Sequence, residues 1–275
     1  MKRRALLTRL GCLTAVAAAG YTGQLRGTND GSDTTPAPTP SPDRFSMSRA
    51  YLRDAFLSVS GADTATVSSK PDARVLFASV RNSSGATFSE DEFVLRLGNS
   101  EVAGETQFDP QSRTAFRFVD DGGGVHATCD GVDSGEQWVL FTVPAEQQIE
   151  TARLTVPGDG DAGWNLDSTI VERVRKPLPT ISLSSVSVPE SVGSEEPVPV
   201  SFELVNDSSF DGVFRAAMNE HGYYNGYYPV SIPVPAGESV SKTVELPNRA
   251  PDAEKMEYEL KTADNEEQFE VAVTS

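Results

Sequence analysis

The sequence predicts an all-β fold made of two tandem antiparallel β-sandwiches, and three observations carry this prediction. Apolar residues alternate with polar ones over short stretches, as in strands with one buried face. Turn segments rich in Asn, Ser, Gly and Pro separate these stretches. The sequence shows no long amphipathic helix pattern, and we expect one short helical turn at residues 48–56.

In the first half of the chain, two stretches show the strand alternation clearly. They cover residues 73–80 and 92–98, and the turn sequence at residues 82–85 lies between them. Alternate side chains of a strand share one face of the sheet, so every second apolar residue is expected in the core. These expected core residues are Leu76, Ala78, Val80, Phe93, Leu95 and Leu97.

In the second half, residues 198–205 alternate in the same way. The expected core residues there are Val200, Phe202 and Leu204. Each half places a strand, then an asparagine, then two serines near its start. This shared order points to an internal duplication.

Prolines mark a break between the two halves. Residues 175–179 read Arg-Lys-Pro-Leu-Pro, and proline lacks the N–H group that a sheet would need to continue through it. We therefore expect a first domain at residues 47–176 and a second at residues 177–275.

Four tyrosines flank an Asn-Gly pair in the second half, where residues 223–228 read YYNGYY. An Asn-Gly pair favours a two-residue hairpin turn because both residues tolerate positive φ. This turn would place Tyr224 opposite Tyr227 and Tyr223 opposite Tyr228. The motif is therefore expected to close a hairpin.

The apolar pattern of the two hairpin strands conflicts with this simple turn. Apolar residues of the incoming strand share the face of Tyr224, whereas those of the outgoing strand share the face of Tyr228. A one-residue bulge near Gly222 or Pro229 would remove the conflict. The tyrosine pair left exposed would then form an aromatic platform for a sugar or a protein, and the alternative is a purely structural hairpin. The candidate ligand-binding residues are His221, Tyr223, Tyr224, Tyr227 and Tyr228.

The charge balance is strongly acidic and bears on the class of partner. Forty acidic against twenty-three basic residues give a formal net charge of −17. This charge excludes an electrostatic case for binding nucleic acid or anionic lipid.

The N-terminus has the features of an export leader over residues 1–20. Basic residues at positions 2–4 precede a weakly apolar run over residues 10–19 that ends in small residues, as signal peptidase requires. Arg3 and Arg4 followed by Ala-Leu-Leu match the twin-arginine signature, which serves the export of folded proteins. The apolar run is too short to span a bilayer, which takes roughly twenty residues.

The leader is followed by a segment that is expected to be a disordered linker, at residues 21–46. It is rich in Pro, Thr, Ser, Gly and Asp and lacks apolar periodicity. The expected location of the exported chain is the cell surface or the extracellular space.

Two segments carry candidate metal ligands. Oxygen-bearing residues stand at alternate positions of a short loop, as in calcium sites, although a solvated turn is the alternative. The four candidate ligands are Asp159, Asp161, Asn165 and Asp167. His126 and Cys129 form a His-x-x-Cys pair, but a zinc site needs four clustered ligands. Cys129 is the single thiol outside the leader, so the alternatives are a buried free thiol and an intermolecular bridge.

Two asparagines stand in glycosylation sequons. Asn82 and Asn206 each precede a serine two positions later, in segments expected to be surface turns. Both are candidate acceptors in an exported chain.

Catalytic signatures are lacking in the sequence. The two histidines lie about a hundred residues apart, and no Gly-x-Ser-x-Gly or phosphate-loop motif occurs. Ser239 and Lys242 match a Ser-x-x-Lys pattern but lie in an expected strand without companion motifs. We therefore expect no enzyme activity and no cofactor.

These segments resemble known families. The strand ending in Asn82, the strand around Phe93 and the Gly-Glu turn before Trp138 are similar to telokin-like, immunoglobulin-like domains. Residues 189–206 with residues 235–239 resemble cell-adhesion-related (CARDB-like) and fibronectin-like modules. These resemblances imply immunoglobulin-like sandwiches without catalytic residues.

The acidic, lysine-poor composition resembles that of proteins from halophilic archaea, and the alternative is an ordinary acidic exported protein. The end of the leader is similar to that of haloarchaeal lipoproteins, except that Tyr21 stands where the lipid-accepting cysteine would be. A lipid anchor is therefore not expected.

Three functions are open at this point. The favoured one is a non-enzymatic surface protein whose sandwiches serve adhesion, spacing or protein binding, with an envelope protein or glycan as partner. The second is a carbohydrate-binding or ligand-binding accessory module centred on the tyrosine hairpin. The third is an enzyme with an unfamiliar site between the domains.

Export through the twin-arginine route predicts a specific mutant effect. Replacing Arg3 and Arg4 by Lys should abolish export, because lysine does not substitute for the arginine pair. Cell fractionation measures this loss, and mass spectrometry of the exported chain should show cleavage near Ala19 without an acyl group. Undiminished export of the double variant would contradict the assignment.

Overall fold

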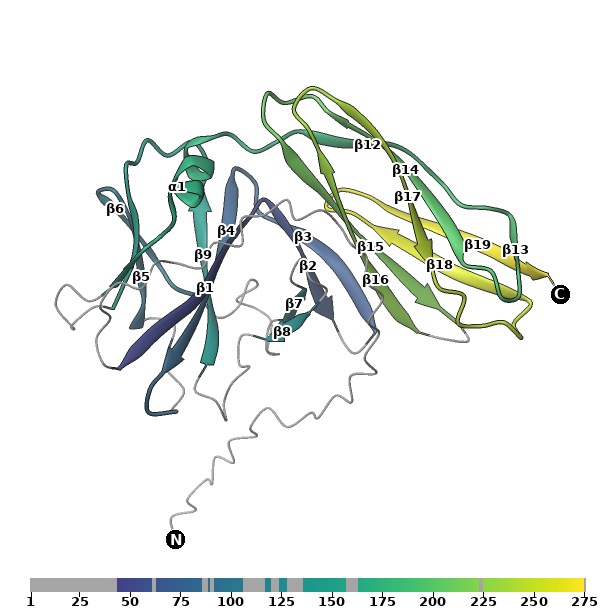
Figure 1. Ribbon diagram of the computed structural model, residues 1–275, viewed down its shortest axis with the longest axis horizontal. Coiled ribbons are helices and arrows are strands. Elements are labelled where there is room, and N and C mark those ends of the chain that lie inside the picture. The colour runs from purple at the N-terminus through teal and green to yellow at the C-terminus, as the bar shows by residue number, and fades with distance from the viewer. Residues whose placement is uncertain are drawn as a thin grey trace, which may run out of the picture. The chain divides into compact units, whose positions relative to one another are not determined.

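The computed structural model describes residues 44–60, 63–85, 89, 92–105, 117–119, 124–127, 136–156, 163–222 and 225–274. Most of these residues lie in β-strands, with one short α-helix (Figure 1). The prediction of an all-β fold of β-sandwiches is therefore confirmed. The predicted leader lies outside the described residues, as does the linker except for its last three residues.

The first half contains eleven of the described strands and the helix. Their bounds are β1 (Phe45–Arg53), β2 (Ala55–Ser60), β3 (Thr64–Ser69), β4 (Ala73–Asn82), β5 (Val94–Leu97), β6 (Ser100–Ala103), β7 (Arg117–Val119), β8 (Val125–Ala127), β9 (Glu136–Pro144), β10 (Ala152–Thr155), β11 (Gly163–Asn165) and α1 (Ser168–Arg175). Strand β1 begins at Phe45, so the last two residues of the predicted linker belong to the first sheet instead.

The second half contributes eight further strands within the described residues. Their bounds are β12 (Ile181–Ser187), β13 (Ser191–Gly193), β14 (Val198–Asn206), β15 (Gly212–His221), β16 (Gly226–Val234), β17 (Ser239–Leu246), β18 (Lys255–Lys261) and β19 (Glu266–Thr274). No described helix has the length and apolar character needed to cross a bilayer.

The strands form five sheets, and each sheet draws its described strands from one half of the chain. The first half forms the sheets β1-β4-β9, β11-β10-β5-β6 and β3-β2-β7-β8. The second half forms the sheets β12-β14-β17 and β13-β19-β18-β15-β16. All described residues nevertheless belong to one compact unit, and the predicted domain boundary at Lys176 stays a prediction.

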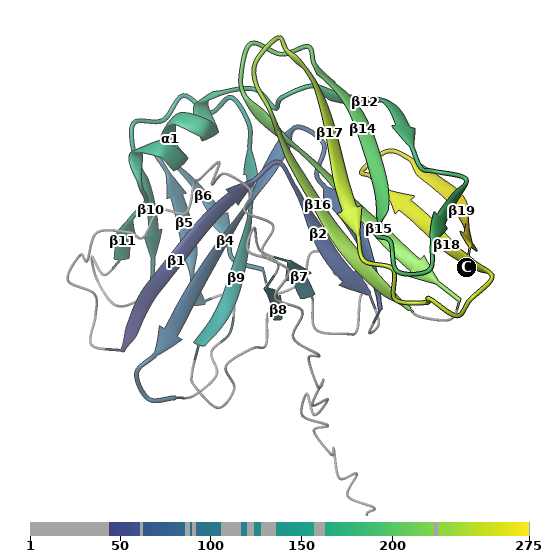
Figure 2. The same cartoon turned by 45° about the vertical axis from the view of Figure 1, so that its right-hand side comes forward.

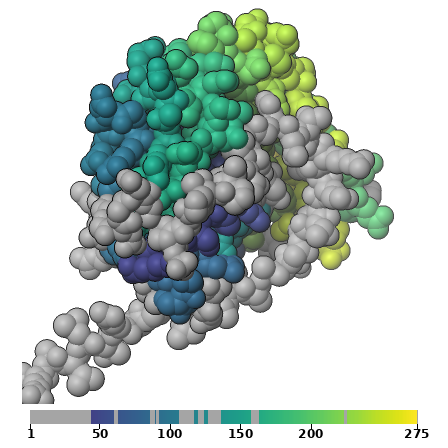
Figure 3. All heavy atoms as spheres, turned by 60° about the vertical axis from the view of Figure 1, so that its left-hand side comes forward, coloured from purple at the N-terminus to yellow at the C-terminus, as the bar shows by residue number. Residues whose placement is uncertain are grey.

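The main core of the first half lies between two of its sheets, β1-β4-β9 and β11-β10-β5-β6 (Figure 2). All six core residues predicted from the first-half alternation are buried in this cluster. Helix α1 adds Ile170, Val171 and Val174 to the same core. Figure 3 shows the outer surface of this part of the chain in teal. The alternation therefore identified one face of the central strand correctly.

The opposite face of sheet β1-β4-β9 is also buried, which the alternation did not predict. Val75 and Phe77 on β4 join an aromatic cluster with side chains from β1, β2, β7 and β9. The other members are Tyr51, Phe56, Phe118, Trp138 and Leu140. The rings of Tyr51 and Trp138 stack with centroids 5.5 Å apart, and Phe118 meets Trp138 edge-on at 5.2 Å. Sheet β3-β2-β7-β8 thus adds a third layer to this half.

Residues 48–56 form no helical turn, and that prediction was wrong. They lie in strands β1 and β2, because Ala50 and Leu52 are needed in the main core while Tyr51 and Phe56 are needed in the aromatic cluster. The helix that does form, α1, follows Asp167, whose carboxylate accepts a hydrogen bond from the Thr169 N–H at 2.8 Å.

The second half buries its core between its two sheets. The predicted core residues Val200, Phe202 and Leu204 are all in this cluster. One strand pair departs from the antiparallel pattern, because β13 runs parallel to the end of β19.

The two halves repeat one local structure at the strand that ends in asparagine. Asn82 ends the central strand β4 and pairs with Phe45, while Asn206 ends the central strand β14 and pairs with Ile181. In both edge strands the register shifts after the third residue, between Met47 and Arg49 and between Leu183 and Ser185. The shared bulge strengthens the indication of an internal duplication.

The asparagine side chains also make the same turn in both halves. Asn82 Oδ1 accepts hydrogen bonds from the N–H and the hydroxyl of Ser84, at 3.0 and 2.8 Å. Asn206 Oδ1 accepts the same pair from Ser208, at 3.0 and 2.5 Å. Asn206 Nδ2 also donates to the carbonyl oxygens of Phe210 and Val234, at 2.8 and 2.9 Å.

These contacts predict unequal roles for the two asparagines. We expect Asn206→Ala to lower the free energy of unfolding by about 3 kcal/mol, because it removes the side-chain donor to the buried Val234 carbonyl and one of two donors to the Phe210 carbonyl. Asn82→Ala should have a smaller effect, because no such Nδ2 contact to buried carbonyls is described for it. Urea unfolding of both variants tests this order, and equal losses would contradict it.

Candidate functional site

The tyrosine hairpin closes with a register that differs from the predicted one. Strand β15 ends at His221 and β16 begins at Gly226, with Glu220 opposite Gly226. Tyr227 therefore lies opposite Asn219, and Tyr228 lies opposite Met218. The predicted pairing of tyrosine with tyrosine across a two-residue turn was wrong. Five residues connect Glu220 to Gly226, which is three more than in the predicted turn.

This longer connection removes the conflict between the two apolar patterns without a bulge in the pair. Phe214, Ala216 and Met218 face the core from β15, and Val230, Ile232 and Val234 face it from β16. Among the described residues of this connection, Gly222 has a positive φ of +101°, and Gly226 has none. Tyr223 and Tyr224 lie outside the described residues.

Tyr228 points toward the second core. Its ring packs against the core cluster, and its hydroxyl donates to Glu220 Oε2 at 2.5 Å. The Arg249 guanidinium carbon lies 5.1 Å from the ring centroid, in cation–π geometry. One face of this ring is therefore occupied by an arginine of the same chain.

Glu220 is the buried carboxyl of this group, with 2% of its surface exposed. Burial raises its pKa, against the hydrogen bond from Tyr228 and the charge of Arg249, which lower it. Burial also raises the pKa of the Tyr228 phenol, and the hydrogen bond to Glu220 adds to the rise. Both groups are thus neutral more readily than in water.

Tyr227 lies on the opposite face of the sheet from Tyr228. It packs against an apolar cluster that joins the two halves of the chain, and burial raises the pKa of its phenol. The residues of this joining cluster are Leu57, Val59, Ala65, Val67, Val119 and Ala217, with Ala55 and Tyr227 at its margin. Neither described tyrosine therefore forms an exposed aromatic platform.

Asn219 forms the polar centre of the contact between the halves. It is fully buried on β15, and its side-chain amide binds the backbone of Ala65 on β3 from both sides. The Ala65 N–H donates to Asn219 Oδ1 at 2.9 Å, and Asn219 Nδ2 donates to the Ala65 carbonyl at 3.0 Å. The amide thus completes the hydrogen bonds of a strand edge, as a neighbouring strand would.

Charged side chains surround Asn219 on the same sheet face. Glu259 Oε2 accepts from Asn219 Nδ2 at 3.2 Å and lies 3.5 Å from His221 Nε2 and 3.3 Å from Lys261 Nζ. The pKa of Glu259 is lowered, because hydrogen bonds from Asn219 and Lys261 outweigh the opposing effect of burial. His221 thus belongs to a cluster of polar side chains, with Glu259 and Lys261, that supports the contact between the two halves of the chain.

A second group of contacts holds the connection between the halves. Arg74, which is buried, donates from its two terminal nitrogens to the carbonyl oxygens of Lys176 and Pro177, at 2.8 and 2.7 Å. Asp54 bridges Arg74 at 2.5 Å and Arg173 at 3.1 Å. Burial lowers the pKa of Arg74, and Asp54 opposes this effect. The predicted proline joint is therefore fixed by a charge pair from the first half.

One serine–carboxylate pair has the residue types of acid–base chemistry. Ser79, which is buried, donates to Glu136 Oε1, and Ser48 donates to the same oxygen at 3.0 Å. The hydrogen bond from Ser79 lowers the pKa of Glu136, with smaller effects from Ser48 and Arg81. A carboxylate with a lowered pKa is a weak base, so this arrangement favours a structural role.

The predicted calcium loop divides between described and undescribed residues. Asp159 and Asp161 lie outside the described residues. Asn165 is exposed at the end of β11, and Asp167 caps helix α1. Within the described parts of the chain, no three His, Cys, Asp or Glu side chains are grouped for a metal ion.

The His-x-x-Cys pair is likewise described only in part. His126 packs against Phe118 and Trp138, with ring centroids 5.4 and 5.1 Å apart. Cys129 lies outside the described residues. The role of the thiol stays open between a buried thiol and an intermolecular bridge.

The two glycosylation candidates are buried in the folded chain. Asn82 is 3% exposed, and Asn206 is not exposed at all. The Nδ2 atom to which a glycan would attach is engaged with two carbonyl groups in Asn206. Modification stays a prediction for both, but it is difficult to combine with export in the folded state.

Sequence reasoning missed Asn219, Glu220 and Arg74, which carry the buried polar contacts. A signal for the first two was available in the sequence. Asn219 and Glu220 are polar, but they directly follow three apolar residues in a strand that is buried on both faces there. Arg74 is the second residue of the apolar stretch at 73–80 and carried no signal, because the two carbonyl groups that it binds lie more than a hundred positions away.

Comparison with known proteins gives no family for the chain. No family model matches it, and no curated protein matches it. Among solved structures, β-glucosidase from Listeria innocua matches 36% of this chain and 17% of its own length, with 16% identity and a TM-score of 0.31. β-Glucuronidase 2 from Bacteroides uniformis matches 81% of this chain and 32% of its own length, with 12% identity and a TM-score of 0.22.

These solved structures are much longer than the part that the chain spans, which is a third of their length or less. At such TM-scores the matches carry no argument about fold or function. The function is therefore argued from the contacts of the chain itself.

The raised pKa of Glu220 predicts a pH-dependent mutant effect. A pKa above the ordinary value of 4.5 means that the folded state favours the protonated carboxyl. Its contribution to stability is full below the unfolded pKa and is lost as pH rises through the folded pKa. Glu220→Gln should therefore stabilise the protein more at pH 8 than at pH 4, because the amide keeps an acceptor for Tyr228 without the charge.

Urea unfolding at both pH values measures this effect. Glu267→Gln on β19 is the matched control, because Glu267 is exposed and loses the same charge. If Glu220→Gln changes the free energy of unfolding by the same amount at pH 8 and at pH 4, burial of the charge is not the dominant effect.

Proposed function

We propose that the chain is a non-enzymatic exported protein whose two sandwich halves act together as a rigid module for spacing or protein binding at the cell surface. The observation that carries this proposal is the buried contact through Asn219. A flexible pair of domains would not need a fully buried amide hydrogen-bonded to the backbone of the other half. The leader, the twin-arginine signature and the linker support the location.

Two separate contacts support rigidity. The first is the apolar cluster around Asn219, which joins β2 and β3 to β15. The second is the Arg74 contact to the carbonyls of Lys176 and Pro177, which removes freedom from the connection itself. A connection held at its backbone and a second contact elsewhere restrict rotation about the joint.

The carboxyl groups that could act in acid–base catalysis have contacts that support a structural role instead. Glu136 is held as a hydrogen-bond acceptor by Ser79, and Glu259 is held by Asn219 and Lys261. Glu220 is hydrogen-bonded to Tyr228 inside the second core. Each of these carboxyls has a partner that serves packing or the contact between halves.

The ligand-binding alternative has no observation in its favour among the described residues. Tyr227 and Tyr228 face two buried clusters, and His221 is paired with Glu259. This alternative would have to rest on Tyr223 and Tyr224.

The proposal can be tested by measuring whether the two halves move relative to one another. Spin labels at Ser100→Cys and Ser241→Cys, in a Cys129→Ser background, place one exposed probe on each half. We expect a narrow distance distribution in pulsed electron resonance. A broad distribution in this otherwise unaltered chain would reject the rigid module, and retention of the chain inside cells would reject the location.

Asn219→Ala should uncouple the halves and destabilise the protein. The variant leaves the N–H and the carbonyl of Ala65 buried without partners, at roughly 1–3 kcal/mol for each group. We expect a loss of about 3 kcal/mol in urea unfolding and faster proteolysis near residues 175–179. Asn165→Ala is the matched control, because Asn165 is exposed on β11. Unchanged stability and proteolysis in Asn219→Ala would contradict the role given to this amide.

A further inference from the structure

The outer edge of β19 has a partner over only part of its length. Strand β13 pairs with Ala272, Val273 and Thr274. Over Glu266–Val271, no strand in the described parts of the chain pairs with this edge. The other edge of β19 is paired with β18 over Glu266–Ala272. Six residues of the strand therefore have an open side.

The direction of the backbone groups along this edge follows from two hydrogen bonds. The Val273 N–H donates to the Glu254 carbonyl at 2.9 Å, on the side of β18. The Ala272 N–H donates to the Glu190 carbonyl at 2.9 Å, on the opposite side. Because successive residues of a strand point their N–H groups to opposite sides, those of Gln268 and Glu270 face the open edge.

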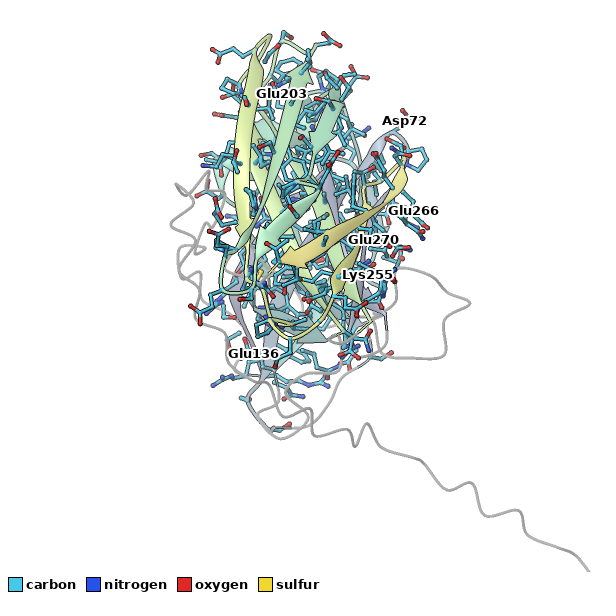
Figure 4. The ribbon with its side chains drawn as sticks, turned by 90° about the vertical axis from the view of Figure 1, so that its right-hand side faces the viewer. Asp72, Glu136, Glu203, Lys255, Glu266 and Glu270 are labelled. Carbon is cyan, nitrogen blue, oxygen red and sulfur yellow. The ribbon has the colours of Figure 1, made fainter. Side chains whose placement is uncertain are left out.

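The side chains beside this edge are predominantly acidic. Glu266 and Glu270 are exposed on β19, next to Glu257 and Glu259 on β18 (Figure 4 shows Glu266, Glu270 and Lys255 along these strands). Lys255 lies 2.9 Å from Glu257 and 2.6 Å from Glu270, and the pair raises its pKa. Lys255 and Lys261 together balance the charge of two of these four carboxylates.

The edge strand at the other side of the same sheet is different. Strand β16 carries Pro229 and Pro233, and proline on an edge strand blocks the addition of a further strand. Strand β19 contains no proline. Its edge is restricted by charge alone, so the sign of the incoming charge decides which chain can pair with it.

We propose that the β19 edge over Glu266–Val271 binds an extended, lysine- or arginine-bearing segment of a partner protein as an added strand. The backbone of Gln268 and Glu270 supplies the hydrogen bonds. Four carboxylates against two lysines leave the outer face with a net negative charge, which favours positive side chains on the incoming strand. A second copy of this chain is disfavoured, because it would place glutamates against glutamates. This inference rests on the proposed binding function and names the class of partner.

The test uses the exported full chain and a labelled eight-residue peptide that alternates lysine with valine. Fluorescence anisotropy should show saturable binding that weakens as salt is raised. A peptide that alternates glutamate with valine and a lysine peptide interrupted by two prolines should each bind at least tenfold more weakly. The first control removes the charge match, and the second removes the strand conformation.

Gln268→Pro is the decisive variant. Its N–H faces the open edge, so proline removes no hydrogen bond to β18, and Gln268→Ala is the matched control. We expect at least tenfold weaker peptide binding with Gln268→Pro, unchanged binding with Gln268→Ala, and an unchanged melting temperature for both. Glu266→Gln with Glu270→Gln should weaken binding and reduce its dependence on salt.

Three results would overturn the proposal. These are no binding of the lysine peptide, equal binding by the Gln268→Pro variant, and equal binding of the proline-interrupted peptide, which would show charge attraction without strand addition. A dimer that Gln268→Pro dissociates would assign the edge to a second copy instead. The assay is independent of export and of rigidity, so its failure is distinguishable from failure of the proposed function.

Discussion

An apolar sheet face has to be covered, and the layers of this chain follow from where that requirement is met. In the first half, Tyr51, Phe77 and Leu140 form a row across three strands on the face away from the main core. Exposure of such a row would cost several kcal/mol. The sheet with β2 and β7 covers it and supplies Phe56 and Phe118 to the same cluster. A two-layer sandwich thereby becomes three layers.

The second half has the same central sheet without the third layer, and its residues explain why. Counted from the shared asparagines, Phe77 corresponds to Ser201, which lies in a row with Ser187 and Thr243. Hydroxyl side chains on this face are compatible with water. No covering sheet is required there, although the strand order, the bulge and the asparagine turn are the same as in the first half.

The five-stranded sheet also has an apolar area that has to be covered, and the contact between the halves covers it. Its outer face presents Ala217 and Tyr227 at one side, and the apolar face of β2 and β3 covers them. Asn219 lies within this covered area and would be costly there without partners. The edge of β3 supplies those partners through Ala65. The remainder of the same face carries the charged residues of β18 and β19, which need no cover.

Alternation along the sequence predicted the strand class and the inner faces of three central strands, because one buried face imposes this local pattern. The sequence also contained the cap of α1 at Asp167, yet that helix was missed because its eight residues are few and include β-branched ones. The second buried face of β4, the register of the tyrosine hairpin and the partners of Asn219 were decided only by the tertiary structure. The hairpin register follows from the core faces of β15 and β16, which the Asn-Gly pair did not indicate. The other two depend on residues distant in sequence, as Ala65 for Asn219 or Lys176 for Arg74, and no local period records which distant backbone group will accept a hydrogen bond.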